Sequence, residues 1–203
     1  MNIGIALLSG GIDSPVAIAL MKNRIEIIAA HFHQQELTGP GETEKVKKLI
    51  KKLEIKKAYL VPFTPVLKHI VEKCKHKDYF ILQKIVMMKA AEIIAEKEEA
   101  KYLITGENLG QVSSQTLSNL VSITKHVKLE ILRPLLTNDK EETIKKAKEL
   151  GTYEISEGPE ICSLLGPKHP ATKSDWQTIG KELENIDFTL VKEAISKAEI
   201  VTN

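Results

Sequence analysis

The sequence predicts an α/β protein, built as three α/β/α layers around a mostly parallel, twisted sheet. Short apolar segments rich in β-branched residues alternate with longer segments that have apolar residues at helical spacing. The first apolar segment also runs through a glycine-rich turn directly into a helical segment. Strands that alternate with helices favour a parallel sheet with crossover helices.

Five segments are expected to be strands, and the first is a short apolar run that ends at the turn residues Ser9, Gly10 and Gly11. The five segments are residues 2–8, 25–32, 58–61, 101–105 and 128–132. The second of them is the richest in β-branched side chains, which pack well on a pleated sheet.

The helices are expected from apolar periodicity and from their start and stop signals. Ser14 is expected to cap the first helix, with Pro15 at its first position. Gly151 is expected to end the helix that precedes it. The expected helices are residues 15–21, 42–53, 64–75, 79–97, 111–120, 139–150 and 188–199, and residues 38–43 (TGPGET) are expected to form a turn.

A length of 203 residues suits one domain. Residues 1–173 are expected to form this domain, and residues 174–203 are expected to form a C-terminal helical extension that packs on it. The tail from Gly151 differs from the preceding chain, because it is rich in Gly, Pro, Ser and His.

Composition excludes several classes of protein. With 42% hydrophobic residues the chain can form a core, which excludes disorder. No apolar run approaches the ~20 residues of a membrane span, and the start MNIGIALLSGG lacks the features of a signal peptide. Two cysteines, Cys74 and Cys162, make no disulfide framework, which predicts a cytoplasmic location. A net charge of +2 predicts no overall field that attracts nucleic acid.

In parallel sheets the ligand lies beyond the carboxyl ends of the strands, where the direction of winding changes. The segments that follow the expected strands are therefore candidates for a site before any chemistry is considered. They are residues 9–14, 31–33, 105–107 and 133–140.

The strongest local pattern is SGGIDS at residues 9–14, between an expected strand and a helix. Gly10 and Gly11 allow the backbone to approach a phosphate chain, and the N-terminus of the next helix presents N–H groups to it. Ser9 and Ser14 add hydroxyl donors. The pattern differs from the Walker A and GxGxxG fingerprints. The alternative, a tight strand-to-helix turn with no ligand, is disfavoured by the full pattern in this context.

Asp13 is unusual in an anion site, because its carboxylate repels phosphate. It is expected either to hold Mg²⁺ or to orient a lysine that neutralises the phosphates. His31 and His33 could suggest a metal pair, but their alternation at a strand end is a weak metal-binding pattern.

SGGIDSPVA at residues 9–17 resembles the PP-loop of ATP pyrophosphatases, which adenylate a substrate and release pyrophosphate. Further stretches resemble the catalytic domain of the tRNA 4-thiouridine synthetase (tRNA sulfurtransferase) family. They are HFH at 31–33, LITGENLGQVSSQTLSNL at 103–120, LRPLLTNDKEE at 132–142, GTYEIS at 151–156 and ICSLLGPKHPAT at 161–172. The resemblance covers nearly the whole chain and implies an adenine-nucleotide α-hydrolase-like fold.

The resemblance implies a transferase that uses ATP and Mg²⁺ to adenylate a uridine carbonyl in tRNA and then replaces the oxygen by sulfur. The product would be 4-thiouridine, and the family is also linked to sulfur supply for the thiamine thiazole. The implied ATP contacts are Leu7, Leu8, Ser9, Gly10, Gly11, Asp13, Ser14, His31, Phe32, Lys84, Gly106 and Gln115. The implied catalytic residues are Asp13, Lys140 and Cys162.

These residue types suit the implied chemistry. Attack on an α-phosphate places negative charge on oxygen atoms, which Lys84, Lys140 and Mg²⁺ can stabilise. A free thiol with its ordinary pKa of about 8.5 is a poor nucleophile at neutral pH, and Lys168 and His169 lie close enough to Cys162 in sequence to lower its pKa. Without the family context, a lone cysteine is more often a small buried residue.

The resemblance does not extend to the family's RNA-binding and rhodanese modules, and these modules are not expected in this chain. Either binding of tRNA is therefore expected to need a separate RNA-binding partner or a second copy in a homodimer, or the chain thiolates a different substrate. Sulfur is expected from a persulfide carrier or free sulfide. The lysines of residues 45–57 and 145–148 bring no interleaved aromatic residues for base stacking. No iron–sulfur cluster is predicted.

Two other functions remain open from the sequence. One is a PP-loop enzyme of the amidotransferase type, which would deliver ammonia and need no cysteine. The other is a non-catalytic ATP-binding subunit of an RNA-modifying complex. An assay of pyrophosphate release separates the second from an enzyme.

Overall fold

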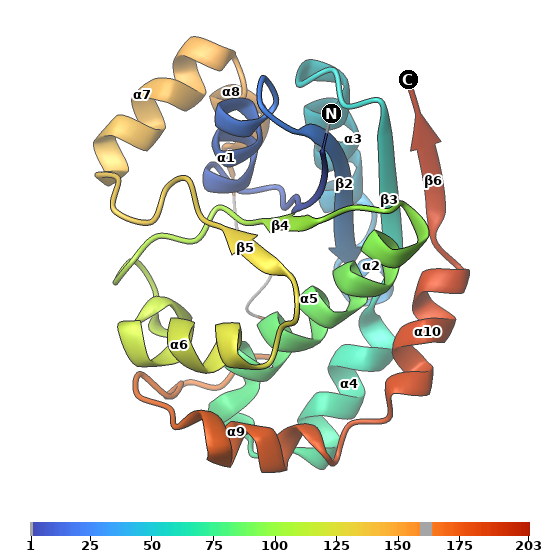
Figure 1. Cartoon of the computed structure of the whole chain (residues 1–203), viewed down its shortest axis with the longest axis vertical. Helices are drawn as coiled ribbons and strands as arrows, with labels where there is room; N and C mark the ends of the chain where they lie inside the picture. Colours follow the sequence, from blue (N-terminus) through green and yellow to red (C-terminus); the bar gives the residue numbers. More distant parts are fainter. Residues whose placement is uncertain (1, 159–163) are drawn as a thin grey trace.

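The computed structural model describes residues 2–158 and 164–203. In this part of the chain six strands form one sheet in the order β5-β4-β1-β2-β3-β6 (Figure 1). All neighbours pair in parallel except β6, which runs antiparallel to β3. The strands are β1 (Ile3–Leu7), β2 (Glu26–His33), β3 (Lys57–Pro62), β4 (Tyr102–Ile104), β5 (Glu130–Leu132) and β6 (Glu199–Thr202).

Helices cover both faces of the sheet, which confirms the three-layer α/β/α class (Figure 1). One layer contains α1 (Asp13–Met21), α3 (Gly41–Lys52), α7 (Lys140–Leu150) and α8 (Tyr153–Ser156). The other contains α4 (Thr64–Lys73), α5 (Tyr79–Lys97), α6 (Leu117–Lys125), α9 (Trp176–Leu183) and α10 (Phe188–Ser196). The single turn α2 (Gln35–Thr38) follows β2, and His76–Asp78 and Ser113–Gln115 form short 3₁₀ turns.

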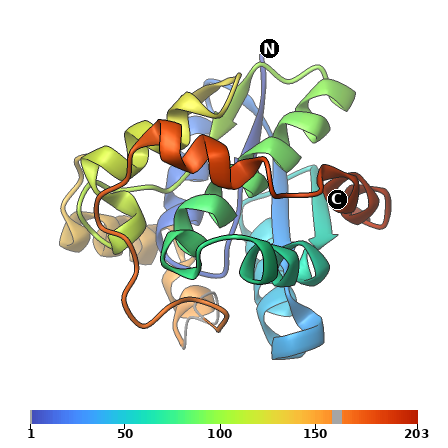
Figure 2. The same ribbon diagram turned by 90° about the horizontal axis from the view of Figure 1, so that it is seen from below.

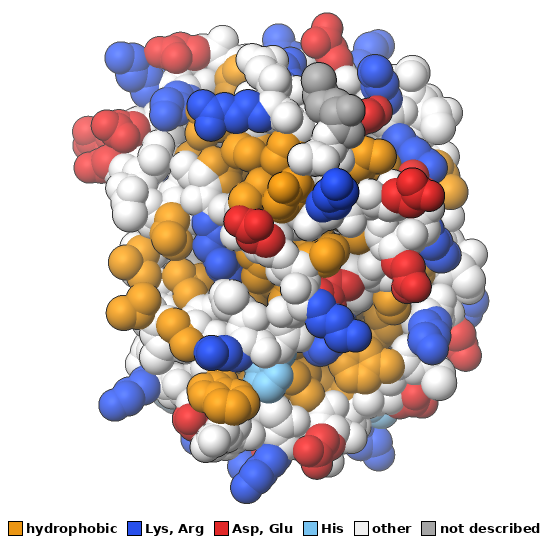
Figure 3. Space-filling view, in the orientation of Figure 1, with side chains coloured by type: hydrophobic (Ala, Val, Ile, Leu, Met, Phe, Trp, Pro, Cys, Tyr) orange, Lys and Arg blue, Asp and Glu red, His pale blue; other side chains and the backbone are white. Residues whose placement is uncertain are grey.

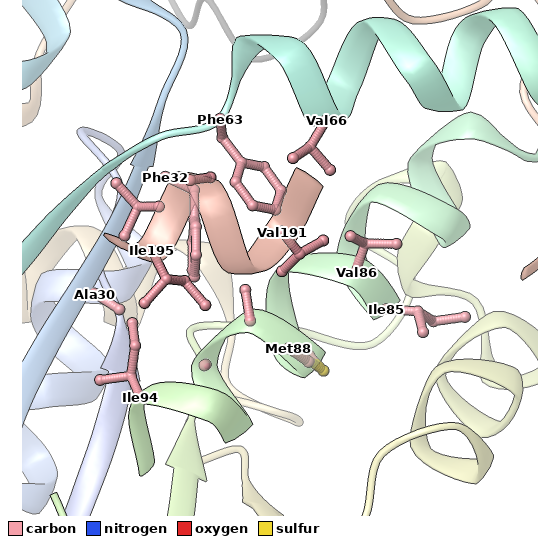
Figure 4. Packing of buried hydrophobic residues seen from close by; sticks show 14 of the residues in the cluster. Ala30, Phe32, Phe63, Val66, Ile85, Val86, Met88, Ile94, Val191 and Ile195 are labelled. Atoms are coloured by element: carbon pink, nitrogen blue, oxygen red, sulfur yellow. The ribbon is translucent and has the colours of Figure 1, made fainter. Parts of the chain in front are cut away.

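The larger core cluster lies between the sheet and the layer that contains α5. Phe32 from β2 and Phe63 after β3 pack with ring centroids 4.8 Å apart (Figure 4). Met88 on α5 and Val191 and Ile195 on α10 complete this part of the core (Figure 4). Burial of these large apolar side chains fixes the ends of β2 and β3, and so the floor of the site described below.

Residues 174–203 pack on the same core. Helix α9 crosses α5 and α6, and α10 contacts α4, α5 and β3 (Figure 2). A purely helical extension is nevertheless wrong, because the helix predicted at 188–199 ends at Ser196 and the chain continues as β6. Ile200, Val201 and Thr202 are β-branched in succession, which suits them to pair with the open edge of β3.

Two predicted helix starts are also wrong. Helix α1 begins at Asp13 without a side-chain cap, because the hydroxyl of Ser14 accepts the N–H of Ser9 instead. The helix predicted at 111–120 begins only at Leu117, where the side chain of Thr116 accepts the N–H of Asn119. Threonine is a favoured N-cap, so a start signal was present in the sequence.

The surface carries both signs of charge. Figure 3 shows acidic and basic side chains interspersed on one face, as the net charge of +2 predicts. On this face hydrophobic side chains gather over α6 and the loop before it, where Leu109, Val112, Leu117 and Val121 are 45–69% exposed (Figure 3). Within residues 2–158 and 164–203, no helix is both long and apolar enough to cross a bilayer.

Candidate active site

The winding of the sheet changes direction at β1, since β2 and β3 follow on one side and β4 and β5 on the other. A cavity of about 460 Å³ opens where β1, β2 and β4 end. This is the position that the rule for parallel sheets predicts for a ligand. Side chains from α3 and α5 and the segment after α8 complete its wall.

All the residues implied as ATP contacts line this cavity. They are Leu7, Leu8, Ser9, Gly10, Gly11, Asp13, Ser14, His31, Phe32, Lys84, Gly106 and Gln115. The fold thus brings together residues from five separate stretches of the chain. Their contact with ATP stays a prediction, as does the role of Cys162, which lies outside the described residues.

Two serines hold the loop at residues 9–14 in shape. The N–H of Ser9 donates to Ser14 Oγ at 2.9 Å, and the N–H of Gly11 donates to Ser9 Oγ at 3.3 Å. From α8, Ser156 Oγ donates to the carbonyl of Gly11 at 3.2 Å. The hydroxyls predicted as phosphate donors therefore also serve to close the loop.

Gly106 lies directly against this loop, at the end of β4. A Cβ on Gly106 would lie 2.7 Å from the carbonyl carbon of Asp13 and from the nitrogen of Ser14. Both neighbours are backbone atoms that cannot swing away. Glycine is therefore required here for the end of β4 to approach the start of α1.

Asp13 and Lys140 form an ion pair at the rim of the loop. Lys140 Nζ lies 2.9 and 3.1 Å from the two carboxylate oxygens of Asp13. Lys140 is the first residue of α7, where the helix dipole disfavours a cation, and the carboxylate of Asp13 offsets this. The geometry matches the lysine-orienting alternative for Asp13, while binding of Mg²⁺ by Asp13 stays a prediction.

Glu107 is a buried carboxylate that received no role from the sequence. It accepts hydrogen bonds from Arg133 Nε at 2.9 Å and Thr105 Oγ at 3.1 Å, and Lys84 Nζ lies 3.5 Å from it. Burial alone would raise the pKa of Glu107, but the charges of Lys84 and Arg133 and these hydrogen bonds hold it below its ordinary value. Glu107 therefore stays ionised and holds Lys84 at the cavity wall. In the sequence, the position of Glu107 shortly after an apolar predicted strand is the signal that could have identified it as a site residue.

His31 is buried at the floor of the cavity. Its Nδ1 contacts the carbonyl of Leu8 at 2.9 Å, so Nδ1 carries the proton and Nε2 is an acceptor. Nε2 is buried and has no hydrogen-bond partner among the described residues, so it is available to a ligand. Burial lowers the pKa of His31 to about 4, although its contact with Leu8 acts in the opposite direction. In the part of the chain that the structure describes, no three His, Cys, Asp or Glu side chains cluster to hold a metal.

Known proteins resemble the chain in both sequence and structure. Residues 2–188 match the family model described as "Thiamine biosynthesis protein (ThiI)". The chain belongs to the ThiI family.

Curated relatives of this ThiI chain include the probable tRNA sulfurtransferases of Finegoldia magna and Moorella thermoacetica. Each is 41% identical to it over 98% of this chain and 53% of its own length. The chain therefore spans about half the length of the curated relatives it matches.

Solved structures also resemble this ThiI chain. A crystal structure of a 4-thiouridine synthetase–RNA complex with bound ATP superposes with a TM-score of 0.93 at 35% identity, over 98% of this chain and 55% of that one. The U34-tRNA thiolase NcsA from Methanococcus maripaludis, with its [4Fe-4S] cluster, shares the fold at 20% identity, with a TM-score of 0.53.

Acidification is expected to destabilise this ThiI chain through His31. Since burial lowers the folded-state pKa to about 4 from an ordinary 6.5, the unfolded chain binds a proton between these values and the folded chain does not. Stability is full above about pH 6.5 and falls by up to about 1.4 kcal/mol per pH unit toward pH 4. Chemical denaturation at several pH values measures this slope.

His31→Gln should reduce the slope, because it removes the buried group whose pKa is lowered. Part of the slope should remain in His31→Gln, because burial also lowers the pKa of His33. An unchanged slope in His31→Gln would show that His31 does not titrate as its burial requires.

Cys74 is poorly suited to react. The helix predicted at 64–75 ends at Lys73, so Cys74 lies just after α4 and not inside a helix. Its thiol contacts the carbonyl of Glu182 at 3.5 Å. Burial, with the charges of Glu182 and Asp78, raises the pKa of Cys74 to about 11. A thiol with this pKa is almost fully protonated at neutral pH and is a weak nucleophile.

Proposed function

We propose that this chain is the ATP-using catalytic part of a tRNA sulfurtransferase. It binds ATP in the cavity, adenylates a uridine carbonyl in tRNA with release of pyrophosphate, and replaces the oxygen by sulfur. The observation that carries the proposal is the convergence of the SGGIDS loop, Gly106 and the Asp13–Lys140 pair at the strand ends. ATP bound in the related 4-thiouridine synthetase and the names of the relatives support it.

The cavity suits a nucleotide. Its volume lies within the range of ordinary ligand pockets. Leu7, Phe32 and Met87 offer apolar surface for a base, and the unpartnered Nε2 of His31 offers a hydrogen-bond acceptor. Gly10 and Gly11 allow phosphates to approach the backbone at the start of α1.

The adenylation step needs positive charge around the phosphates. When the uridine oxygen attacks the α-phosphorus, the bond to the β-phosphate oxygen breaks and negative charge passes to pyrophosphate. Lys140, held by Asp13, and Lys84, held by Glu107, are the side chains that we assign to stabilise this charge. Mg²⁺ would supply further neutralisation. It is commonly held by one or two carboxylates together with phosphate oxygens, which fits the single carboxylate of Asp13.

The sulfur step is assigned to Cys162. Its thiolate takes the outer sulfur of a carrier persulfide, and the carrier leaves as a thiol. That outer sulfur then attacks C4 of the adenylated uridine, AMP leaves with the former carbonyl oxygen, and an external dithiol reduces the resulting disulfide to release 4-thiouridine. Free sulfide, as the other donor, would attack C4 directly and form no bond to Cys162. The raised pKa of Cys74 supports the assignment, because it leaves Cys162 as the other cysteine of the chain. The family description names thiamine biosynthesis, so we propose that the same transfer chemistry also serves the thiamine thiazole. We also propose that tRNA binds through a partner protein or a homodimer. A cytoplasmic location is part of the same proposal.

The proposal is tested by incubating the protein with tRNA, ATP, Mg²⁺ and sulfide or a persulfide carrier. Pyrophosphate release and the nucleoside composition of the tRNA are measured together. With the persulfide carrier as donor, Cys162→Ser is expected to keep pyrophosphate release and to stop formation of 4-thiouridine. The matched variant Cys74→Ser is expected to keep both.

Other outcomes separate the alternatives. Thiolation by Cys162→Ser with free sulfide would show that sulfide attacks the adenylated base directly. Transfer of ammonia in place of sulfur would favour an amidotransferase-type enzyme. A wild-type protein that binds ATP without releasing pyrophosphate in the presence of tRNA would favour the non-catalytic subunit.

A further inference from the structure

Lys45 reaches into the wall of the cavity from α3. A Cβ on Gly10 would lie 3.1 Å from Lys45 Cδ, so the side chain passes directly beside the glycine loop. Its Nζ donates to the carbonyls of Ser156 and Glu157 at 3.3 and 3.2 Å. In the sequence, Lys45 is one lysine of the basic stretch at residues 45–57.

Lys45 differs from the other cations of the site in its partners. Lys140 is paired with Asp13, and Lys84 is paired with Glu107. Between described residues, no ion pair includes Lys45, and its ammonium meets carbonyl oxygens, which carry no net charge. Lys45 is therefore the lysine of the cavity wall that forms no ion pair with a carboxylate of the described residues.

An anionic ligand needs such a cation in this cavity. The carboxylates of Glu42 and Glu157 line it as well, and they would repel a phosphate chain. Hydrogen bonds to charged oxygens are stronger than those to neutral carbonyls, so a phosphate beside Gly10 would compete for the ammonium of Lys45.

We propose that Lys45 is a phosphate-binding residue of this site and that it contacts the two outer phosphates of ATP, which leave as pyrophosphate. The inference rests on the proposed function, because it requires ATP in the cavity. AMP lacks the outer phosphates, so a cation that contacts them distinguishes the two nucleotides. The same ammonium also holds Ser156 and Glu157, so nucleotide binding is linked to the segment that leads along the chain toward Cys162.

The test compares equilibrium binding of ATP and AMP to the whole chain. Lys45→Met is expected to weaken binding of ATP by roughly tenfold or more, the loss typical of one hydrogen bond to a charged group, and to leave binding of AMP nearly unchanged. Lys45→Arg should retain most of the affinity, because it keeps the charge. The matched control is Lys48→Met, which removes an exposed lysine of the same helix and should alter neither affinity.

Each other result has a defined meaning. If the wild type binds ATP and Lys45→Met binds it equally well, Lys45 is not a phosphate ligand and the proposed function stands. Equal losses for ATP and AMP would assign Lys45 to the shape of the cavity, which also overturns the inference. Failure of the wild type to bind ATP would overturn the proposed function itself. Melting temperatures establish folding, and Lys45→Gln replaces Lys45→Met if the latter unfolds.

Discussion

Replacing Lys140 by alanine is expected to lower the rate of pyrophosphate release about 10²–10³-fold while ATP affinity falls far less. Both carboxylate oxygens of Asp13 hold Lys140 at the rim of the loop. The reason for the expectation is our assignment of Lys140 to the additional charge that develops when the α-phosphorus is attacked. The measurement is single-turnover pyrophosphate release with labelled ATP, beside equilibrium binding of ATP. Equal losses in rate and affinity would make Lys140 a binding residue only.

The control for this variant is Lys145→Ala, which removes an exposed lysine of the same helix and should change neither quantity.

Asp13→Ala should cause a loss comparable to that of Lys140→Ala with the protein still folded. If the two residues act as one unit, the double variant should be little worse than either single variant. Additive losses would show that Asp13 and Lys140 act separately, as they would if Asp13 bound Mg²⁺.

Gly106→Ala is expected to have the second large effect, on both stability and ATP binding. The added Cβ would meet the backbone of Asp13 and Ser14 at 2.7 Å, so either β4 or the start of α1 must shift. Overpacking of this kind typically costs about 1–3 kcal/mol of folding stability. We expect a lower melting temperature and a severe loss of ATP affinity, since the shift displaces the phosphate loop.

Gly41→Ala is the matched control for stability. An added Cβ on Gly41 meets no atom within 4 Å, and its backbone has an ordinary φ at the first position of α3. Its melting temperature should equal or exceed that of the wild type, because alanine favours the helix. A Gly106→Ala variant with the stability and ATP affinity of the wild type would show that the strand and the loop are free to separate.

Short-range patterns predicted the elements whose cause is local. All five predicted strands form, with small shifts at their ends. The central ones are apolar runs that suit strands buried on both faces, whereas β5 lies at the edge of the sheet and contains the exposed Glu130. The helix at residues 79–97 has the predicted bounds, and Gly151 ends α7 in the left-handed conformation as expected. The SGGIDS loop and the strand-end candidates were also found in this way, because parallel strands carry their following residues to one edge.

Elements that depend on distant partners were missed. β6 forms because β3 leaves an open edge beside α10, and the sequence does not reveal which strand lies at that edge. Helix α9 was missed for a different reason. Its start signal is local, since the side chain of Asp175 accepts the N–H of Thr178, but this cap was not used in the prediction. The single turns α2 and α8 are too short to show a periodic pattern.

The residues of the site divide in the same way. Adjacent residues were enough to identify the SGGIDS loop as a candidate, because its glycines and serines and the helix that follows lie together within a short stretch of sequence. Pairs such as Asp13 with Lys140, Glu107 with Lys84, and Lys45 with Ser156 became visible only in the folded chain. Charges act through space over a few ångströms, whereas these partners are far apart along the chain. Their pairing therefore depends on how the layers pack, and no local pattern records it.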